Sequence, residues 1–91
     1  MFTMLGPQKV QHDSGYVVQT GDRYHLEYLE GERVAVVEVD FGSVISIYVD
    51  RIAWKTPSNA LPITWQEKAK IVERVVAVLR FQHERFELVP G

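Results

Sequence analysis

The chain has 91 residues, of which 46% are hydrophobic and 24% charged, and its formal net charge is -2. This length allows one domain, residues 1–91, with a single modest core, and the composition excludes an intrinsically disordered chain. Without cysteine there is no disulfide framework, and without a signal peptide pattern or an apolar run of ~20 residues we expect a cytoplasmic protein with no membrane partner.

Turn signals that contain glycine recur through the first half of the chain, at residues 13–15, 20–22, 30–32 and 41–43. The runs between them are rich in valine, isoleucine and tyrosine, which favour strands. We predict strands over residues 16–20, 23–29, 33–40 and 44–50, with a weaker edge strand over 8–12. This spacing is typical of an antiparallel β-meander.

Alternation along these strands divides the side chains between two faces. We expect one apolar set in the core: Tyr16, Val18, Tyr24, Leu26, Tyr28, Ala35, Val37, Val39, Ile45, Ile47 and Val49. The opposite set is acidic, aromatic and aliphatic: Val17, Gln19, His25, Glu27, Val34, Val36, Glu38, Asp40, Ser46 and Tyr48. In antiparallel sheets a face of this kind is commonly left in water.

The alternation breaks after Val49, because the next large apolar residues, Ile52 and Trp54, have the opposite parity. A bulge near Asp50 and Arg51 would realign them and bring both to the edge of the core, where the indole N–H of Trp54 can still reach a partner. We expect Pro57, Ser58 and Asn59 to end the sheet.

Thr64 followed by Glu67 is a capping-box pattern, so we predict that a helix begins there. Its apolar stripe comprises Trp65, Ala69, Ile71, Val72, Val75, Val76, Val78 and Leu79. A last alternating strand, residues 85–89, can add Phe86 and Leu88 to the core. The predicted fold is therefore α+β: an antiparallel β-meander of four to six strands, packed on one face by a single C-terminal helix and followed by a last short strand.

Motifs for catalysis or ligand binding are missing from the sequence. His25 and Glu27 share a strand face and could form an acid/base or metal pair, but on an exposed sheet such residues are usually solvated surface. Gly31 and Gly42 lie in hairpins and do not form a phosphate-binding loop. The basic residues of the predicted helix are scattered around it, with Glu67 and Glu73 among them, and the sequence pI is near 5.9, so we expect no nucleic-acid binding. We predict no enzyme activity, no catalytic residue, no metal site and no cofactor.

Charge is distributed unequally along the chain. Residues 1–50 contain eight acidic and three basic residues, and residues 51–91 contain four acidic and seven basic residues. This pattern is consistent with two solvated faces or with an acidic surface that attracts a basic partner. Tyr48 lies beside Val36 and Glu38 on the outer set, so it is either a contact residue or an amphipathic tyrosine on an exposed strand.

The run from Ile47 to Trp54 (IYVDRIAW), then Leu61-Pro62-Ile63, then Glu67 and Ile71, resembles immunity protein family 74 of bacterial polymorphic toxin systems. In that family a strand ending in aspartate, isoleucine and tryptophan precedes a proline-containing loop, a helix and a last strand. The resemblance covers residues 15–89. It implies a small non-catalytic inhibitor that binds and neutralises a cognate toxin domain.

We therefore expect a bacterial interaction protein whose protein partner, such as a basic toxin domain, contacts Glu27, Val36, Glu38, Asp40 and Tyr48. The three carboxylates could mimic phosphates for a nuclease toxin. The alternative is a structural or regulatory homo-oligomer, such as a homodimer, with Val17, Val34, Val36 and Tyr48 as its self-interface. A small hydrolase or ligand-binding domain is the third hypothesis, and it requires a deep polar pocket containing His25.

Overall fold

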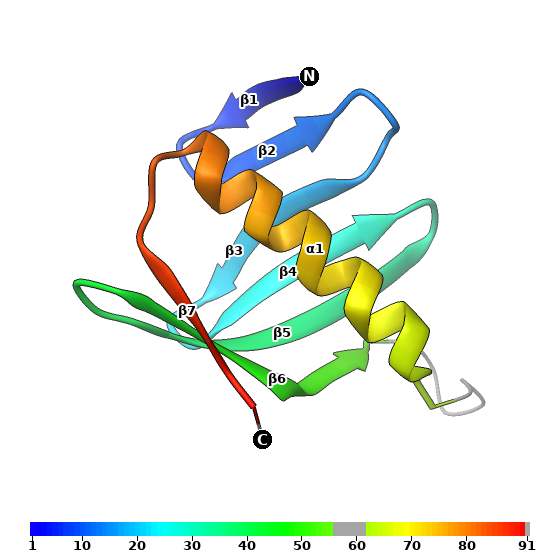
Figure 1. Cartoon of the computed structure of the whole chain (residues 1–91). Helices are drawn as coiled ribbons and strands as arrows, with labels where there is room; N and C mark the ends of the chain where they lie inside the picture. The colour runs from blue at the N-terminus through cyan, green and yellow to red at the C-terminus, as the bar shows by residue number, and fades with distance from the viewer. Residues whose placement is uncertain (56–61, 91) are drawn as a thin grey trace.

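A computed structural model describes residues 1–55 and 62–90, which form one sheet and one helix (Figure 1). In chain order the elements are β1 (Phe2–Gly6), β2 (Lys9–His12), β3 (Val17–Asp22), β4 (His25–Glu30), β5 (Arg33–Phe41), β6 (Ile45–Trp54), α1 (Trp65–Phe81) and β7 (Phe86–Val89). The strands follow one another across the sheet in the same order. Strands β1 to β6 form an antiparallel meander, and β7 pairs parallel with β6, so the predicted α+β fold is confirmed.

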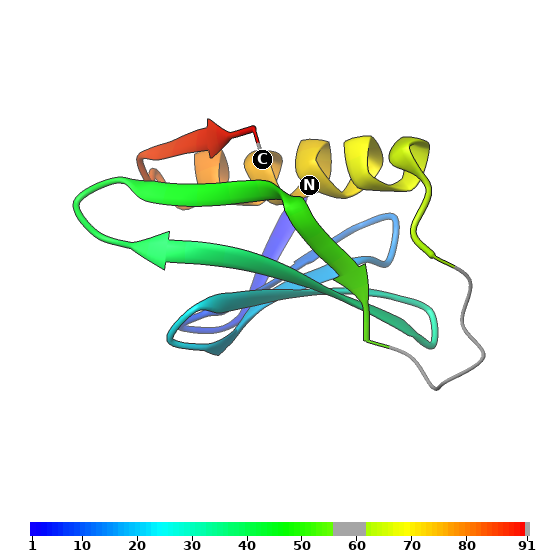
Figure 2. The same ribbon diagram turned by 90° about the horizontal axis from the view of Figure 1, so that it is seen from below.

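Helix α1 crosses one face of the sheet diagonally (Figure 1). The sheet curves around it, so that β6 and β7 stand at the level of the helix while β3 and β4 lie below it (Figure 2). Four buried helix residues, Ile71, Val75, Val78 and Leu79, pack against the buried residues of the strands. Because the helix is rich in valine, this burial, at roughly 1.5–3 kcal/mol per large apolar side chain, stabilises it more than helix propensity does.

The predicted change of register in β6 is confirmed. Val39 of β5 pairs with Ile47 and Val37 pairs with Ile52, so that Glu38 alone faces residues 48–51. This bulge reverses the parity of the strand, and Ile52 is consequently buried while Trp54 packs half-buried against the core. The residues that we expected to end the sheet, Pro57, Ser58 and Asn59, lie outside the described residues, as does Leu61.

The helix begins as predicted. Thr64 is its N-cap, and the Thr64 hydroxyl accepts a hydrogen bond from the backbone N–H of Glu67 at 3.1 Å. The Glu67 carboxylate in turn accepts from the backbone N–H of Thr64 at 2.9 Å. Both hydrogen bonds of the capping box are therefore formed.

The prediction that Tyr24 belongs to the core is wrong, because this side chain is 55% exposed. Strand β3 continues through Gly21 to Asp22, and the turn is formed by Arg23 and Tyr24 instead of residues 20–22. Asp22 fixes this turn because its carboxylate accepts from the backbone N–H of Tyr24 at 2.8 Å. A larger residue at Gly21 would displace the Glu27 side chain, since a Cβ there would lie 2.9 Å from Cγ of Glu27.

Three other residues expected in the core, Trp65, Ala69 and Leu88, are also exposed. Trp65 and Ala69 lie beside the row of Ile71, Val75 and Val78 that faces the sheet, so the buried stripe of α1 is narrower than predicted. Leu88 lies on β7, which has a neighbouring strand on one side only.

Strand β1 was not predicted, and it makes β2 an internal strand instead of the expected edge. Val10 of β2 is fully buried as a result. Phe2 of β1 reaches the end of α1, with its ring centroid 5.1 Å from that of Phe81.

Candidate partner-binding surface

The face of the sheet opposite α1 carries all five residues predicted to contact a partner. We call it the outer sheet face, and by strand parity it includes, on β3 to β6, Val17, Gln19, His25, Glu27, Leu29, Val34, Val36, Glu38, Asp40, Ser46, Tyr48 and Ala53. Glu27 pairs directly with Val36, and His25 pairs with Glu38. Asp40 pairs with Ser46 of β6. The meander therefore brings residues from four strands into one continuous surface.

Three of these five residues, Glu38, Asp40 and Tyr48, line an open depression in the outer sheet face. We call it the bulge depression, and Tyr24, His25, Val39 and Arg51 complete its lining. Arg51 contacts two sides of it, because its guanidinium donates a hydrogen bond to Glu38 and lies 5.6 Å from the ring centroid of Tyr48. Sequence alternation did not identify Arg51, because alternation does not assign the direction of a residue inside a bulge.

The carboxylates of the outer sheet face differ in whether they already form hydrogen bonds and ion pairs within the protein. Glu27 accepts hydrogen bonds from Gln19 at 2.8 Å and from Lys55 at 3.2 Å. The Gln19 amide and then Lys55 hold the pKa of Glu27 below its ordinary value. Glu38 pairs with Arg51, whereas Asp40 makes no ion pair with any residue that the structure describes. Two of the three carboxylates predicted to mimic phosphates thus already have basic partners.

Four ion pairs join bases from the second half of the chain to acids from the first half, whereas Arg33 and Glu67 pair in the opposite sense. Lys55 pairs with Glu27, and Lys70 and Arg74 both pair with Glu30 at 3.0 and 3.2 Å. Three of the eight acids of residues 1–50, Glu27, Glu30 and Glu38, are thus neutralised by bases of the second half. Exposed pairs of this kind contribute about 0–1 kcal/mol each, so a partner could replace one at little cost.

His25 pairs with Asp22 instead of Glu27. Its Nδ1 lies 2.8 Å from a carboxylate oxygen of Asp22, and the hydrogen bond from the backbone of Tyr24 is the main cause of a lowered pKa of Asp22. The depression containing His25 is open to solvent and is not the deep polar pocket that the hydrolase hypothesis requires. Among residues 1–55 and 62–90, no group of three or more His, Asp or Glu side chains is arranged to hold a metal ion. No helix in these ranges is long and apolar enough to cross a membrane.

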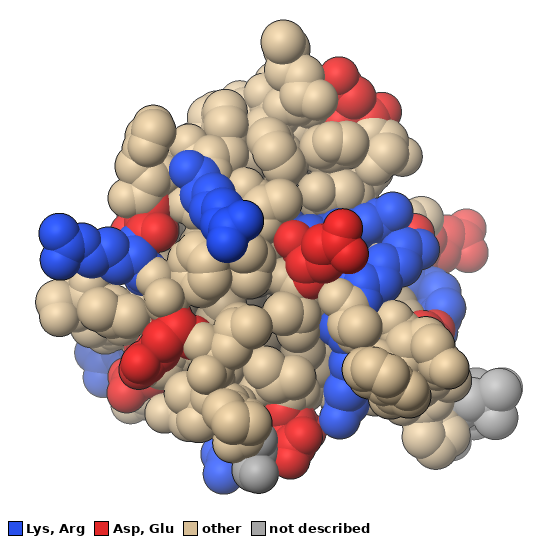
Figure 3. Space-filling view, in the orientation of Figure 1, with Lys and Arg blue, Asp and Glu red and all other residues tan. Residues whose placement is uncertain are grey.

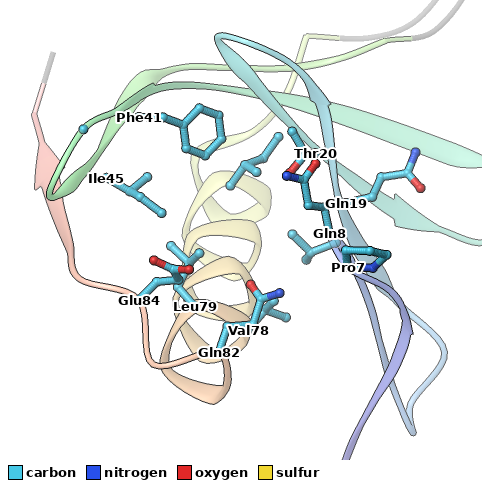
Figure 4. A pocket seen from close by; sticks show the side chains of 13 residues that line it. Pro7, Gln8, Gln19, Thr20, Phe41, Ile45, Val78, Leu79, Gln82 and Glu84 are labelled. Carbon is cyan, nitrogen blue, oxygen red and sulfur yellow. The ribbon is translucent and has the colours of Figure 1, made fainter.

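A more enclosed pocket of about 270 Å³ lies elsewhere, between the sheet and the C-terminal end of α1 (Figure 4). Core residues such as Ile45 and Leu79 line it, together with the polar side chains of Gln8, Gln82 and Glu84. The sequence did not predict this pocket, because its lining comes from segments far apart in the chain. His25 does not line it. Its volume is slightly below the range of typical small-molecule sites.

No protein-family model matches the chain, and neither a curated protein nor a solved structure matches it. The fold and the exposed face together define a small α+β domain. Helix α1 covers one face of its sheet, and no other described element covers the opposite face.

Proposed function

We propose that this protein is a small non-catalytic bacterial interaction protein that binds a protein partner through the outer sheet face. The bulge depression is the observation that supports this proposal, since it gathers Tyr48, Arg51 and Glu38 on a face that α1 does not cover. Tyrosine and arginine are enriched among the residues that dominate binding energy at protein interfaces. A partner that fills the depression would contact both.

We further propose that the partner is a toxin domain and that binding neutralises it. The run of residues 47–54, which resembles immunity protein family 74, has two roles in the structure: Ile47 and Ile52 are buried, whereas Tyr48 and Arg51 line the bulge depression. A basic toxin surface is complementary to the carboxylate of Asp40. A basic residue of the toxin could also replace Arg51 as the ion-pair partner of Glu38. Complementary charge of this kind mainly increases the association rate.

The test uses the toxin domain encoded next to this gene, with binding measured by calorimetry and protection measured by co-expression. We expect Tyr48→Ala to weaken binding at least about tenfold, as a truncated interface anchor does. The double variant Glu38→Lys/Asp40→Lys should slow association, and the effect should shrink at high salt. Glu32→Lys, in the exposed turn between β4 and β5, is the matched control and should bind normally. Normal binding by both test variants would reject this face, and failure of the wild-type protein to bind or protect would reject the immunity function.

A second candidate function is self-association through the same face. Val17, Leu29 and Val34 form a cross-strand row of half-buried aliphatic side chains beside Val36. Light scattering distinguishes this candidate, because it requires a dimer that Val34→Lys dissociates.

A further inference from the structure

The enclosed pocket between the sheet and the C-terminal end of α1 is a second candidate binding site (Figure 4). We call it the helix-end pocket. Its lining comes from the turn between β1 and β2, from β3 and β4, from the hairpin that joins β5 to β6, and from the end of α1 with the segment that follows it. None of the described residues that line it also lines the bulge depression. The helix-end pocket is therefore a separate site, and its role does not depend on the function proposed above.

The interior of the helix-end pocket is apolar. Five lining residues belong to the hydrophobic core and are at most 7% exposed: Val18, Leu26, Ile45, Val78 and Leu79. The volume of about 270 Å³ corresponds to about nine water molecules at ~30 Å³ each. The pocket can therefore enclose the apolar group of a small ligand but is too small to enclose a nucleotide.

The charge in the lining has one sign. Among the described residues that line the pocket, Glu84 alone is charged, and its sequence neighbours His83 and Arg85 do not line it. Glu84 makes no ion pair with any residue that the structure describes. The end of α1 adds the partial negative charge of its last carbonyl groups. Figure 3 shows charges of both signs scattered over the helix side of the molecule, so the lining itself determines that the pocket is complementary to a cation.

The end of α1 fixes Glu84 beside the pocket. The backbone N–H of His83 donates to the carbonyl of Arg80 at 3.1 Å, and the N–H of Glu84 donates to the carbonyl of Leu79 at 2.9 Å. These are the two hydrogen bonds of a Schellman motif, with His83 in the left-handed conformation (φ 59°) that glycine usually adopts there. The residue after it commonly makes an apolar contact with the last helical turn. Here that position carries a carboxylate next to an apolar pocket (Figure 4).

We propose that the helix-end pocket binds a small primary amine that carries an apolar group of about eight non-hydrogen atoms. The apolar group lies between Ile45 and Leu79, and the ammonium group donates a hydrogen bond to the Glu84 carboxylate. The side-chain oxygens of Gln8 and Gln82, which also line the pocket, can accept the remaining ammonium hydrogens. A hydrogen bond between charged groups is about twice as strong as one between neutral groups, which favours an amine over an alcohol of the same shape.

Phenethylamine is the probe, because it joins an apolar group of this size to a primary ammonium group. Titration of the full chain, followed by nitrogen–proton correlation spectra, reports both the affinity and the place of binding. We expect phenethylamine to shift the amide signals of Thr20, Gly42 and Glu84. Phenethyl alcohol, which has a hydroxyl in place of the ammonium group, should bind at least about tenfold more weakly. Phenylacetate, an anion, should not bind.

Two substitutions test the two parts of the site. Glu84→Gln should weaken phenethylamine binding at least about tenfold and leave the binding of phenethyl alcohol within about twofold of the wild type. Glu32→Gln is the matched control, since it removes an exposed carboxylate outside the pocket, and it should bind as the wild type does. Gln8→Trp places a large side chain at the pocket and should weaken the binding of both compounds. Because Glu84 and Gln8 are exposed, both variants should keep the circular dichroism spectrum of the wild type.

Absence of shifts at the helix-end pocket when phenethylamine is added to the wild-type protein would overturn the proposal. Equal binding of phenethylamine and phenylacetate would also overturn it, as would a preference for the amine that survives Glu84→Gln. Toxin binding by the Tyr48 variant reports on the outer sheet face, so this proposal and the proposed function fail separately.

Discussion

Among single residues, Tyr28 and Arg74 form the buried contact that joins the sheet to the helix. Tyr28 is fully buried, and Arg74 donates hydrogen bonds to its hydroxyl at 2.6 Å and to Glu30 at 3.2 Å. We predict that Arg74→Met lowers the free energy of unfolding by about 1–3 kcal/mol, because it removes both the charged hydrogen bond to the buried Tyr28 hydroxyl and the ion pair with Glu30. Urea denaturation measures this loss.

A double-mutant cycle isolates this hydrogen bond. In Tyr28→Phe the hydroxyl is absent, so adding Arg74→Met should cost less than it does in the wild-type protein, by about 0.5–1.5 kcal/mol. Arg23→Met, in the exposed turn before β4, should stay within about 0.5 kcal/mol of the wild type. Strictly additive costs for the two substitutions would contradict the assignment.

This contact also marks where sequence reasoning ends for single residues. The alternation of β4 correctly placed Tyr28 in the core, whereas the predicted apolar stripe of α1 did not include Arg74. Arg74 nevertheless reaches inward, because its long side chain lies over the ring of Tyr16, 4.6 Å from the centroid, and ends at Tyr28. Helical periodicity assigns a direction to each residue but does not account for the length of its side chain, so it could not predict the contact of Arg74 with Tyr28.

At the scale of elements, the N-terminus of α1 depends on the capping box. The Glu67 carboxylate accepts from the backbone of Thr64, and this hydrogen bond is the main cause of the lowered pKa of Glu67. The Glu67 carboxylate also forms an ion pair with Arg33 at 3.2 Å. The guanidinium of Arg33 lies over the ring of Trp54. The indole N–H of Trp54 also contributes to the lowered pKa of Glu67 through a hydrogen-bonding interaction, so the Glu67 carboxylate is the partner within its reach. The N–H makes no hydrogen bond of ordinary geometry with any described residue.

We predict that Thr64→Ala lowers the free energy of unfolding by about 1 kcal/mol, because it leaves the backbone N–H of Glu67 without its acceptor. Thr64→Ser keeps the hydroxyl and serves as the control, with a much smaller change. Chemical denaturation compares the two variants. Equal losses would show that the methyl group of Thr64, and not its hydroxyl, stabilises this end of the helix.

The elements differ in how much the sequence reveals about them. The bulge of β6 could be predicted because Ile47, Ile52 and Trp54 report the change of parity locally. Strand β1 could not, because it is held by pairing with β2 and by the contact of Phe2 with Phe81, which is remote in sequence. The parallel pairing of β7 depends on the path of α1 across the sheet.

The outer sheet face shows the same division between local and remote information. Strand parity placed Glu27, Val36, Glu38, Asp40 and Tyr48 on one face, because alternation is a local property of each strand. The ion pairs of Glu27 with Lys55 and of Glu38 with Arg51 could not be predicted in the same way. Predicting them requires the register between neighbouring strands, which alternation within one strand does not provide.

In the whole molecule, ion pairs between the two halves of the chain make stability depend on pH. Lys70 is the main cause of the lowered pKa of Glu30, and Gln19 and then Lys55 lower the pKa of Glu27. Both carboxyls have an ordinary pKa near 4.5, which is their value in the unfolded chain. A carboxyl with a lower pKa in the folded state stabilises the fold fully above the unfolded pKa. That contribution is lost as the pH falls through the folded pKa.

We therefore predict that the urea midpoint of the wild-type protein is constant from pH 7 to about pH 5 and falls as the pH is lowered further. The double variant Glu27→Gln/Glu30→Gln should be less stable at pH 7, because it lacks the three ion pairs of these carboxylates with Lys55, Lys70 and Arg74, and its midpoint should fall less on acidification. The two proteins should become similar once the pH lies below the lowered pKa values of Glu27 and Glu30 in the folded wild type. Glu32→Gln, at an exposed turn, should follow the wild type throughout. Parallel curves for the wild type and the double variant would mean that other carboxylates govern the acid response, and that these pairs do not hold the two halves of the chain together.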